Sequence, residues 1–243
     1  MDDQDKPANP KIGDWIETTP LPKPIAASWS AGKRLIFHKG KVYIFGSSNA
    51  EDALLTNVYY SKINVNGSLG SWVETTPLPK KYSDQDVVKI GNYVYLITGA
   101  NGSTDVYYAS VKDDGSVGSW ISTSPLQPSR QGFAVAEYGS YIYSVAGNAG
   151  GLKDFVKFTS VKPDGSLNTW QDTTPLPEPT QDTHTAVASN GYLYVLTHTG
   201  NSYYATINSN GALGQWTKTT PLPEVISRYS AFGFNGYLYN LGW

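Results

Sequence analysis

The stretch Trp170-Gln-Asp-Thr-Thr-Pro-Leu-Pro177 decides the fold, because the chain contains five closely related copies of it. The other four copies begin at Trp15, Trp72, Trp120 and Trp216. The copies recur at intervals of about fifty residues, a period typical of stacked structural repeats. Since each Trp holds a fixed place in its repeat, we expect these rings to form the core between neighbouring units.

Three further segments lie between successive copies of this phrase, and each has the composition of a β-strand. One unit contains the runs 133–136, 141–145 and 155–161 before the phrase at Trp170. Such runs are short, rich in β-branched and aromatic residues, and bounded by Gly, Asn, Asp or Pro. No segment has an apolar period of 3.6 residues long enough for a helix. We name the four strands of a unit A, B, C and D, with D carrying the Trp.

The connections between these strands predict how they pair. A–B connections such as Asn190-Gly191, and C–D connections such as Asp164-Gly165, supply the positive-φ residues that tight hairpins need. Each unit is therefore expected to be a four-stranded antiparallel meander, and five meanders in a ring form a β-propeller. We expect an all-β, five-bladed propeller of residues 13–243 after a polar leader of residues 1–12. The repeat units are expected near residues 13–28, 29–79, 80–127, 128–177, 178–223 and 224–243.

The last blade is expected to be incomplete. The chain starts at a D strand, residues 13–18, and stops at a B strand, residues 237–243, so the last blade lacks a C strand. We expect the N-terminal strand to close the ring by pairing directly with residues 237–243. The alternatives are a strand from another chain at the open edge 237–243, or a natural protein that continues past Trp243, of which this is a truncated or engineered version.

The chain resembles the kelch-repeat family. The kelch pattern has an Arg- or His-containing first strand, a Tyr-bearing second strand ending in Gly, and a Trp in the fourth. Arg130, Tyr141-Ile-Tyr-Ser-Val-Ala-Gly147 and Trp170 follow this pattern. A kelch unit usually ends its second strand with two glycines, whereas this chain has one or a substitute. The resemblance implies a propeller, and kelch propellers serve as enzymes, lectins and protein-binding modules alike.

Composition narrows the classes of partner and cofactor. The formal net charge is −2, and only 16% of residues are charged, which disfavours nucleic acid as a partner. The chain has no Cys, so disulfides and zinc–thiolate sites are excluded. No apolar stretch has the length of a membrane-spanning helix. The histidines His38, His184 and His198 lack the spacing of metal ligands, so we expect no metal and no cofactor. Abundant Tyr, Thr, Asn and Gly favour an extracellular or periplasmic location.

A ligand site is expected on the face that carries the B–C and D–A loops. The A–B and C–D turns are nearly identical from unit to unit, whereas the B–C and D–A loops vary, and variable loops on a rigid scaffold carry binding sites. Aromatic rings and charged groups near the starts of the A strands suit a hydroxyl-rich ligand such as a glycan. The candidate binding residues are Trp29, Tyr82, Asp84, Asp86, Arg130, Gln131, Asp182, His184, Arg228 and Tyr229.

Three classes of function follow from this reading. The leading hypothesis is a non-catalytic, lectin-like propeller that holds a carbohydrate or similar polar ligand. The first alternative is a glycosidase or sugar isomerase, since Asp84 or Asp86 with Asp182 and His184 would supply carboxylates across the channel. The second alternative is a structural or protein-interaction propeller.

Overall fold

The computed structural model describes residues 16–23, 34–48, 54–82, 84–180, 185–223, 229–234 and 237–242. These residues form antiparallel sheets, and the helical segment among them is a single 3-10 turn, η2 (Ala100–Gly102). The strands are β1 (Leu35–His38), β2 (Lys41–Ser48), β3 (Leu54–Lys62), β4 (Val73–Thr75), β5 (Gln85–Ile90), β6 (Tyr93–Thr98), β7 (Val106–Ser110), β8 (Ile121–Ser122), β9 (Ala134–Tyr138), β10 (Tyr141–Val145), β11 (Val156–Ser160), β12 (Gln171–Asp172), β13 (Thr185–Ser189), β14 (Tyr192–Leu196), β15 (Ser202–Thr206), β16 (Thr217–Thr219), β17 (Tyr229–Phe234) and β18 (Tyr237–Gly242).

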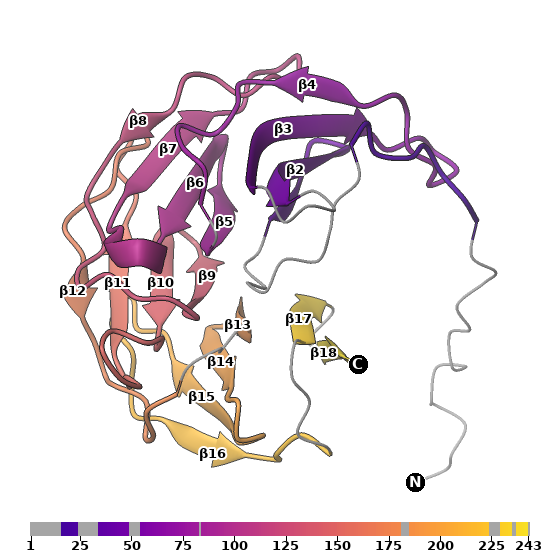
Figure 1. The fold of residues 1–243 in the computed structure, drawn as a ribbon. Helices are drawn as coiled ribbons and strands as arrows, with labels where there is room; N and C mark the ends of the chain where they lie inside the picture. The colour runs from indigo at the N-terminus through magenta and orange to yellow at the C-terminus, as the bar shows by residue number, and fades with distance from the viewer. Residues whose placement is uncertain are drawn as a thin grey trace, which may run out of the picture.

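The strands make five radial sheets, which we number as blades in chain order. Blades 1 to 4 are the four-stranded meanders β1–β4, β5–β8, β9–β12 and β13–β16, and blade 5 is the pair β17–β18. Figure 1 shows them around a common centre, with β4, β8, β12 and β16 at the outer rim. Neighbouring blades meet through their innermost strands, from β1 against β5 to β13 against β17. The expected all-β, bladed propeller is therefore confirmed.

The apolar core of the described residues lies between blades. One buried cluster joins blades 1 and 2, a second joins blades 2 and 3, and a third joins blades 3 and 4. The repeated tryptophans pack in these clusters: Trp120 in the first, Trp170 in the second and Trp216 in the third. Their predicted place in the inter-blade core is confirmed for these three, whereas Trp72 is half-buried and belongs to none of the three clusters, and Trp15 lies outside the described residues.

A repeated set of hydrogen bonds, which we call the inter-blade clamp, links the Thr-Thr phrase of one blade to the next. Between blades 3 and 4, the Leu213 N–H donates to Thr173 Oγ1 at 2.7 Å, and Thr174 Oγ1 donates to the Leu213 carbonyl at 2.8 Å. The Trp216 indole N–H donates to the Thr174 carbonyl at 2.9 Å. The repeated phrase therefore holds neighbouring blades together, in addition to ending a strand.

A tyrosine of strand B completes this arrangement by donating to the C–D turn of the following blade. The hydroxyls of Tyr43, Tyr95 and Tyr143 donate to the carbonyls of Gly115, Gly165 and Gly211, at 3.0, 2.9 and 2.8 Å. All three tyrosines are fully buried. At Gly211 the φ is +86°, and a Cβ there would lie 2.4 Å from the Tyr141 ring, so both the turn and the packing require glycine.

The N-terminal segment makes the same clamp with blade 1. Thr18 Oγ1 accepts from the Leu69 N–H at 2.7 Å, and Thr19 Oγ1 donates to the Leu69 carbonyl at 2.7 Å. Trp72 then donates to the Thr19 carbonyl at 3.1 Å. Residues 16–18 are in no strand and do not form the direct ladder with 237–242 that we expected; Thr18 and the following Thr19 bond the turn of blade 1 instead. Among the described strands, β18 pairs only with β17, and residues 13–15 and 243 lie outside the description.

The described residues include no helix long and apolar enough to span a membrane.

Candidate functional site

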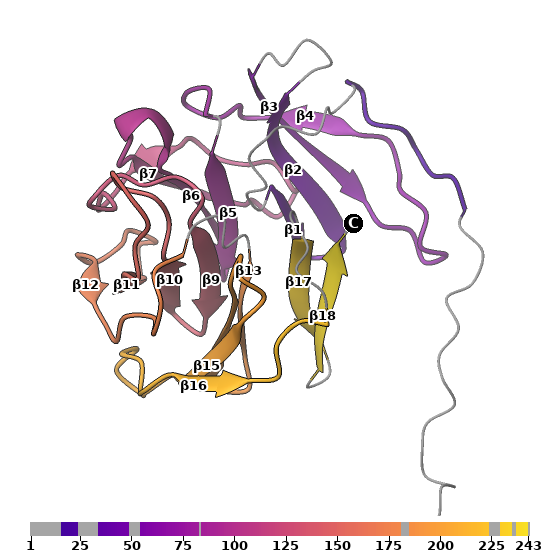
Figure 2. The same ribbon diagram turned by 60° about the horizontal axis from the view of Figure 1, so that its bottom comes forward.

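Two adjoining hollows lie on the face that carries the B–C and D–A loops. The first, of about 380 Å³, is lined by residues 80–82 and 101–105, and the second, of about 390 Å³, by residues 99, 101–102, 128–131 and 148–150. Asn101 and Gly102 line both, so the η2 turn separates the hollows. The η2 turn connects β6 to β7 along the chain, and Figure 2 shows it as a short coil beside β7 at the outside of the ring. Loops from three blades thus meet at one concave surface, and each volume is in the range of small-ligand sites.

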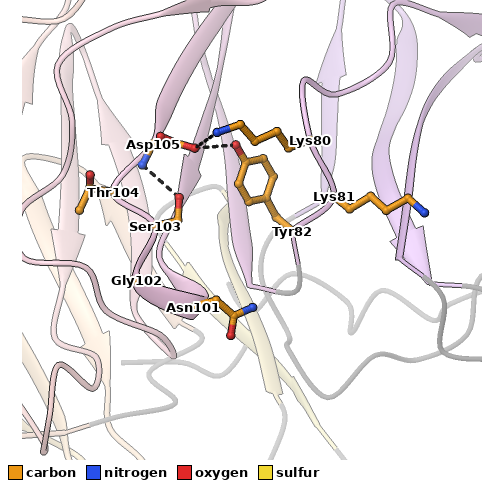
Figure 3. Close-up of a pocket in the computed structure, with 8 residues that line it drawn as sticks. All are labelled: Lys80, Lys81, Tyr82, Asn101, Gly102, Ser103, Thr104 and Asp105. Atoms are coloured by element: carbon orange, nitrogen blue, oxygen red, sulfur yellow. Dashed lines mark hydrogen bonds and ion pairs between the residues drawn. The ribbon is translucent and has the colours of Figure 1, made fainter.

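A carboxylate organises the first hollow (Figure 3). Asp105 Oδ2 accepts from Lys80 Nζ at 2.9 Å and from the Tyr82 hydroxyl at 3.0 Å, and the Asp105 N–H donates to Ser103 Oγ at 3.2 Å. The Lys81 side chain is exposed and points away from this cluster. The D–A loop is therefore tied to the B–C loop by one charged group, while Lys81 and Asn101 have no hydrogen-bond partner among the described residues.

These contacts shift the pKa values of the three groups in the directions that the geometry predicts. The hydrogen bond from Lys80 is the main cause that lowers the pKa of Asp105. The same bond raises the pKa of Lys80. Burial, followed by hydrogen bonds with Tyr107 and Asp105, raises the pKa of Tyr82. All three groups therefore keep their usual charge at neutral pH, and the first hollow is a fixed polar surface without a group poised to exchange a proton.

A buried arginine lies at the second hollow. Arg130 Nη2 donates to Ser144 Oγ at 2.7 Å, and its guanidinium carbon lies 5.8 Å from the centroid of the Phe155 ring. Its Nε and Nη1 atoms are buried without a hydrogen-bond partner among the described residues. Burial lowers the pKa of Arg130 to about 10, so the side chain is still charged at neutral pH. The second hollow therefore lies beside a cation, Arg130, that still has unpaired hydrogen-bond donors.

Glycine at the end of strand β6 allows this arginine to come close. A Cβ on Gly99 would lie 1.8 Å from the Arg130 carbonyl oxygen and 2.7 Å from the Phe133 ring. No side chain fits in that space. The single glycine at the end of the B strand therefore positions the D–A loop of the next blade, which forms one wall of the hollow.

The structure brings together some of the residues that the sequence suggested. Tyr82 lines the first hollow, and Arg130 and Gln131 line the second. Tyr229 begins β17, and its side chain is not described. The remaining candidates Trp29, Asp182, His184 and Arg228 lie outside the described residues.

Asp84 and Asp86 are buried and line neither hollow. Their residues are 7% and 3% exposed, and Asp84 Oδ2 accepts from the Gly132 N–H at 2.6 Å. Both carboxylates attract Arg34, whose pKa is nevertheless lowered because burial outweighs that attraction. Asp84 thus links blade 2 to the loop that enters blade 3. Its distance to Asp182 is outside the description, so the enzyme alternative has no measured carboxylate pair.

Several lining residues were not singled out in the sequence. Asn101, Gly102, Ser103 and Thr104 belong to a B–C loop that was expected to vary, and variation was the only available signal for them. Lys80, Lys81 and Asp105 carry no motif at all. Their convergence comes from the ring, which places the end of one blade beside the loop of the next.

Among the residues that the structure describes, no three His, Asp or Glu side chains come close enough to hold a metal ion. His198 Nδ1 lies 2.7 Å from Thr180 Oγ1, and His38 is buried with a pKa lowered mainly by that burial. His38 Nε2 is buried without a hydrogen-bond partner among the described residues.

Comparisons with known proteins concern the fold. A solved structure entitled "Structure of YjhT" matches with a TM-score of 0.60 and 14% sequence identity, over 84% of this chain and 74% of that one. At this level of identity the likeness shows a shared propeller architecture and nothing about activity. No family model matches the chain, and no curated protein matches it. The kelch-like pattern is therefore a resemblance in sequence, and the propeller is the shared property.

Proposed function

We propose that this chain is a non-catalytic, lectin-like propeller that holds a carbohydrate or a similar polar ligand across the two hollows of the B–C/D–A loop face. The observation that carries this proposal is the meeting of polar loops from three blades at two concave surfaces that share Asn101 and Gly102. Blades 1 to 4 are linked by the inter-blade clamp, so the loops of blades 1 to 3 are presented on a fixed frame. A preorganised site of this kind binds with little loss of conformational entropy.

The chemistry of the hollows favours a ligand rich in hydroxyl groups and acceptors. Asn101 and Gln131 are exposed amides, which donate to and accept from sugar hydroxyls. Lys81 contributes an exposed positive charge and Arg130 a buried one beside the second hollow, whereas the lining carboxylate Asp105 is already bonded to Lys80 and Tyr82. A glycan that carries a carboxylate or sulfate group would satisfy this balance best, because charge-assisted hydrogen bonds are the strong ones.

A glycan array, followed by titration calorimetry with the glycans retained, tests the proposal. Asn101 has φ +56°, so Asn101→Gly removes the amide and leaves the left-handed turn unstrained. Loss of one or two hydrogen bonds should weaken binding about 5- to 10-fold. Asn190→Gly is the matched control, since Asn190 has φ +51° in a turn of the opposite face. This control should bind as the unaltered chain does.

The array distinguishes the three classes of function. Retention of a glycan, with sensitivity to Asn101→Gly and Gln131→Ala, supports the proposal. Retention followed by cleaved or isomerised product would replace it with the enzyme that uses channel carboxylates. If neither substitution changed glycan retention, or if no glycan were retained, the proposal that these hollows bind a glycan would be wrong.

A further inference from the structure

The second hollow contains a positive charge that no acidic side chain in its lining balances. Of the residues that line it, Arg130 carries a charge and the others are neutral. The carboxylate that attracts Arg130 is Asp172, whose side chain is 79% exposed and is bonded to Lys157 at 2.6 Å. Solvent and Lys157 therefore screen that attraction. The guanidinium of Arg130 has no close counter-ion among the described residues.

Most of the hydrogen-bond donors of this guanidinium are also unused. An arginine side chain has five N–H donors. The Nη2 group donates to Ser144 Oγ at 2.7 Å, whereas Nε and Nη1 are buried without a hydrogen-bond partner among the described residues. A buried charge that is neither paired nor fully hydrogen-bonded costs free energy. In native proteins such a group is often explained by an ion or a water that the site holds.

Another buried arginine shows how this fold compensates the same charge from within the chain. Arg34, which precedes β1, is attracted by the carboxylates of Asp84 and Asp86. Arg130 precedes β9, and its interactions with described side chains are those with Ser144, the Phe155 ring and the screened Asp172. Arg34 therefore has buried counter-charges in the folded chain, whereas Arg130 can still accept one from a ligand.

We infer that Arg130 binds an acidic group of the ligand, a carboxylate or a sulfate ester, at the second hollow, and that the chain therefore selects acidic glycans over neutral ones. The inference rests on the proposed function for the sugar part of the ligand, and it adds the residue that sets the specificity. Carboxylate and sulfate oxygens accept charge-assisted hydrogen bonds from a guanidinium, which are roughly twice as strong as neutral ones. Burial strengthens them further, because the local dielectric is low.

The two hollows differ in how they receive an acidic group. The first hollow has a carboxylate of its own, Asp105, whose partners Lys80 and Tyr82 are already bonded to it. Like charges repel, so an acidic group is disfavoured there. The acidic end of the ligand therefore lies beside Arg130. The hydroxyl-bearing remainder extends past Asn101, which lines both hollows.

A local movement must accompany binding, because Arg130 is only 1% exposed in the free chain. One hydrogen bond, to Ser144, fixes the end of its side chain. The adjoining wall includes Gly150 and Gly151, with φ of +70° and +125°, and a Cβ added to either would meet nothing within 4 Å. A rotation of the guanidinium or a small shift of this turn would expose the free N–H groups. Changes of this size are common when partners bind.

Titration calorimetry with paired glycans tests the inference. Oligogalacturonate and its methyl ester form one pair, and a sulfated galactose oligosaccharide and its unsulfated form make the other. Each acidic glycan that the array retains is also measured beside its neutral counterpart. We expect the acidic member to bind about 10- to 100-fold more tightly, the value of charged hydrogen bonds in a buried site. Arg130→Met should abolish this preference and leave the binding of the neutral member unchanged.

The Tm of the free chain separates a ligand-binding arginine from a structural one. Arg130→Met should leave the Tm close to that of the unaltered chain, because removal of an uncompensated buried charge offsets the lost bond to Ser144. Arg34→Met should lower the Tm, because Asp84 and Asp86 would be left without their cation. Arg130→Lys is a second variant that keeps the charge and lacks the guanidinium fork. It should weaken binding of the acidic member about 3- to 10-fold.

The contrary outcomes distinguish this inference from the proposed function. Equal binding of acidic and neutral glycans, or a preference that both Arg130→Met and Arg130→Lys retain, would overturn the inference and leave a glycan site in place. If no glycan bound, the Tm in sodium acetate or sodium sulfate would be compared with that in sodium chloride at equal ionic strength. A rise that Arg130→Met abolishes would support the anion site and overturn the glycan proposal alone. No rise would overturn both.

Discussion

The tripeptide Tyr-Leu-Tyr occurs twice in strand B, at residues 192–194 in β14 and at residues 237–239 in β18, with different surroundings. Leu193 is completely buried between blades 3 and 4, whereas Leu238 is 43% exposed. The two segments have the same composition and the same pairing with an A strand. The difference is that β14 has a C strand on its other side and a neighbouring blade over its face. In this fold a strand B leucine is therefore buried by the neighbouring strand and the neighbouring blade. The A–B hairpin alone does not bury it.

Truncation of the two leucines should give the largest contrast. Leu193→Ala removes a fully buried side chain and leaves a cavity in the core of blades 3 and 4, so unfolding free energy should fall by about 2–5 kcal/mol. Leu238→Ala should cost under about 1 kcal/mol, because the side chain is already partly in water. Urea denaturation of both variants measures the difference. Equal losses of unfolding free energy would mean that β18 is covered in solution, and that Leu193 and Leu238 do not differ in burial there.

Two glycines in C–D turns allow the same comparison between a turn that is covered by a neighbouring blade and one that is not. Gly67 and Gly211 have φ of +84° and +86°, so alanine should cost about 1–2 kcal/mol of backbone strain at either position. A Cβ on Gly211 would also collide with Tyr141 of the preceding blade, whereas a Cβ on Gly67 meets nothing within 4 Å. Gly211→Ala should therefore be worse than Gly67→Ala by about 1–3 kcal/mol. Thermal unfolding of the two variants should show this gap, and identical Tm values would mean that a blade also covers Gly67.

The tyrosine hydroxyls should give a smaller effect. Tyr143→Phe removes a buried donor to the Gly211 carbonyl and should lower the free energy of unfolding by about 1 kcal/mol. Tyr239→Phe on β18 should leave stability unchanged within error, since the ring is 42% exposed and its hydroxyl has no partner among the described residues. Chemical denaturation of each variant against the unaltered chain is sufficient. If Tyr239→Phe lowered the free energy of unfolding as much as Tyr143→Phe, the Tyr239 hydroxyl would have a hydrogen-bond partner in solution, contrary to this comparison.

Acidification should have the smallest effect, at the first hollow. The pKa of Asp105 is lowered in the folded state, chiefly by Lys80, so its contribution to stability is present above its unfolded value near about 4 and is lost as pH falls through the folded value. Since Lys80 is mostly exposed and Asp105 is only partly buried, solvent screens this pair and the contribution should be small. Asp105→Asn should flatten the decline in Tm between about pH 5 and pH 3 slightly. A steeper decline in the variant would contradict the sign of this linkage.

The candidate site was predictable only as a region. The uniform turns and variable loops indicated the face on which the two hollows lie, and Tyr82, Arg130 and Gln131 line these hollows. Asp84 and Asp86 are buried and line neither hollow; Asp84 accepts from the Gly132 N–H, and both carboxylates attract Arg34. Alternation along a strand predicts which side chains share a face, but not how far a loop from the next blade covers them.

The sequence by itself determined the period, the strand types and the turns of this protein. Five Trp phrases, Asx-Gly steps and alternating Tyr runs are local signals, since propensity and turn chemistry act over a few residues. Only the tertiary structure decided which hydroxyls are bonded, which identical segments are buried and which loops meet. Thr173 and Thr219 stand in equivalent phrases, yet of these two only the Thr173 hydroxyl bonds a C–D turn among the described residues. The residues that make such a contact are about forty positions apart along the chain. A local sequence pattern therefore does not predict whether the next blade is in place to form the contact.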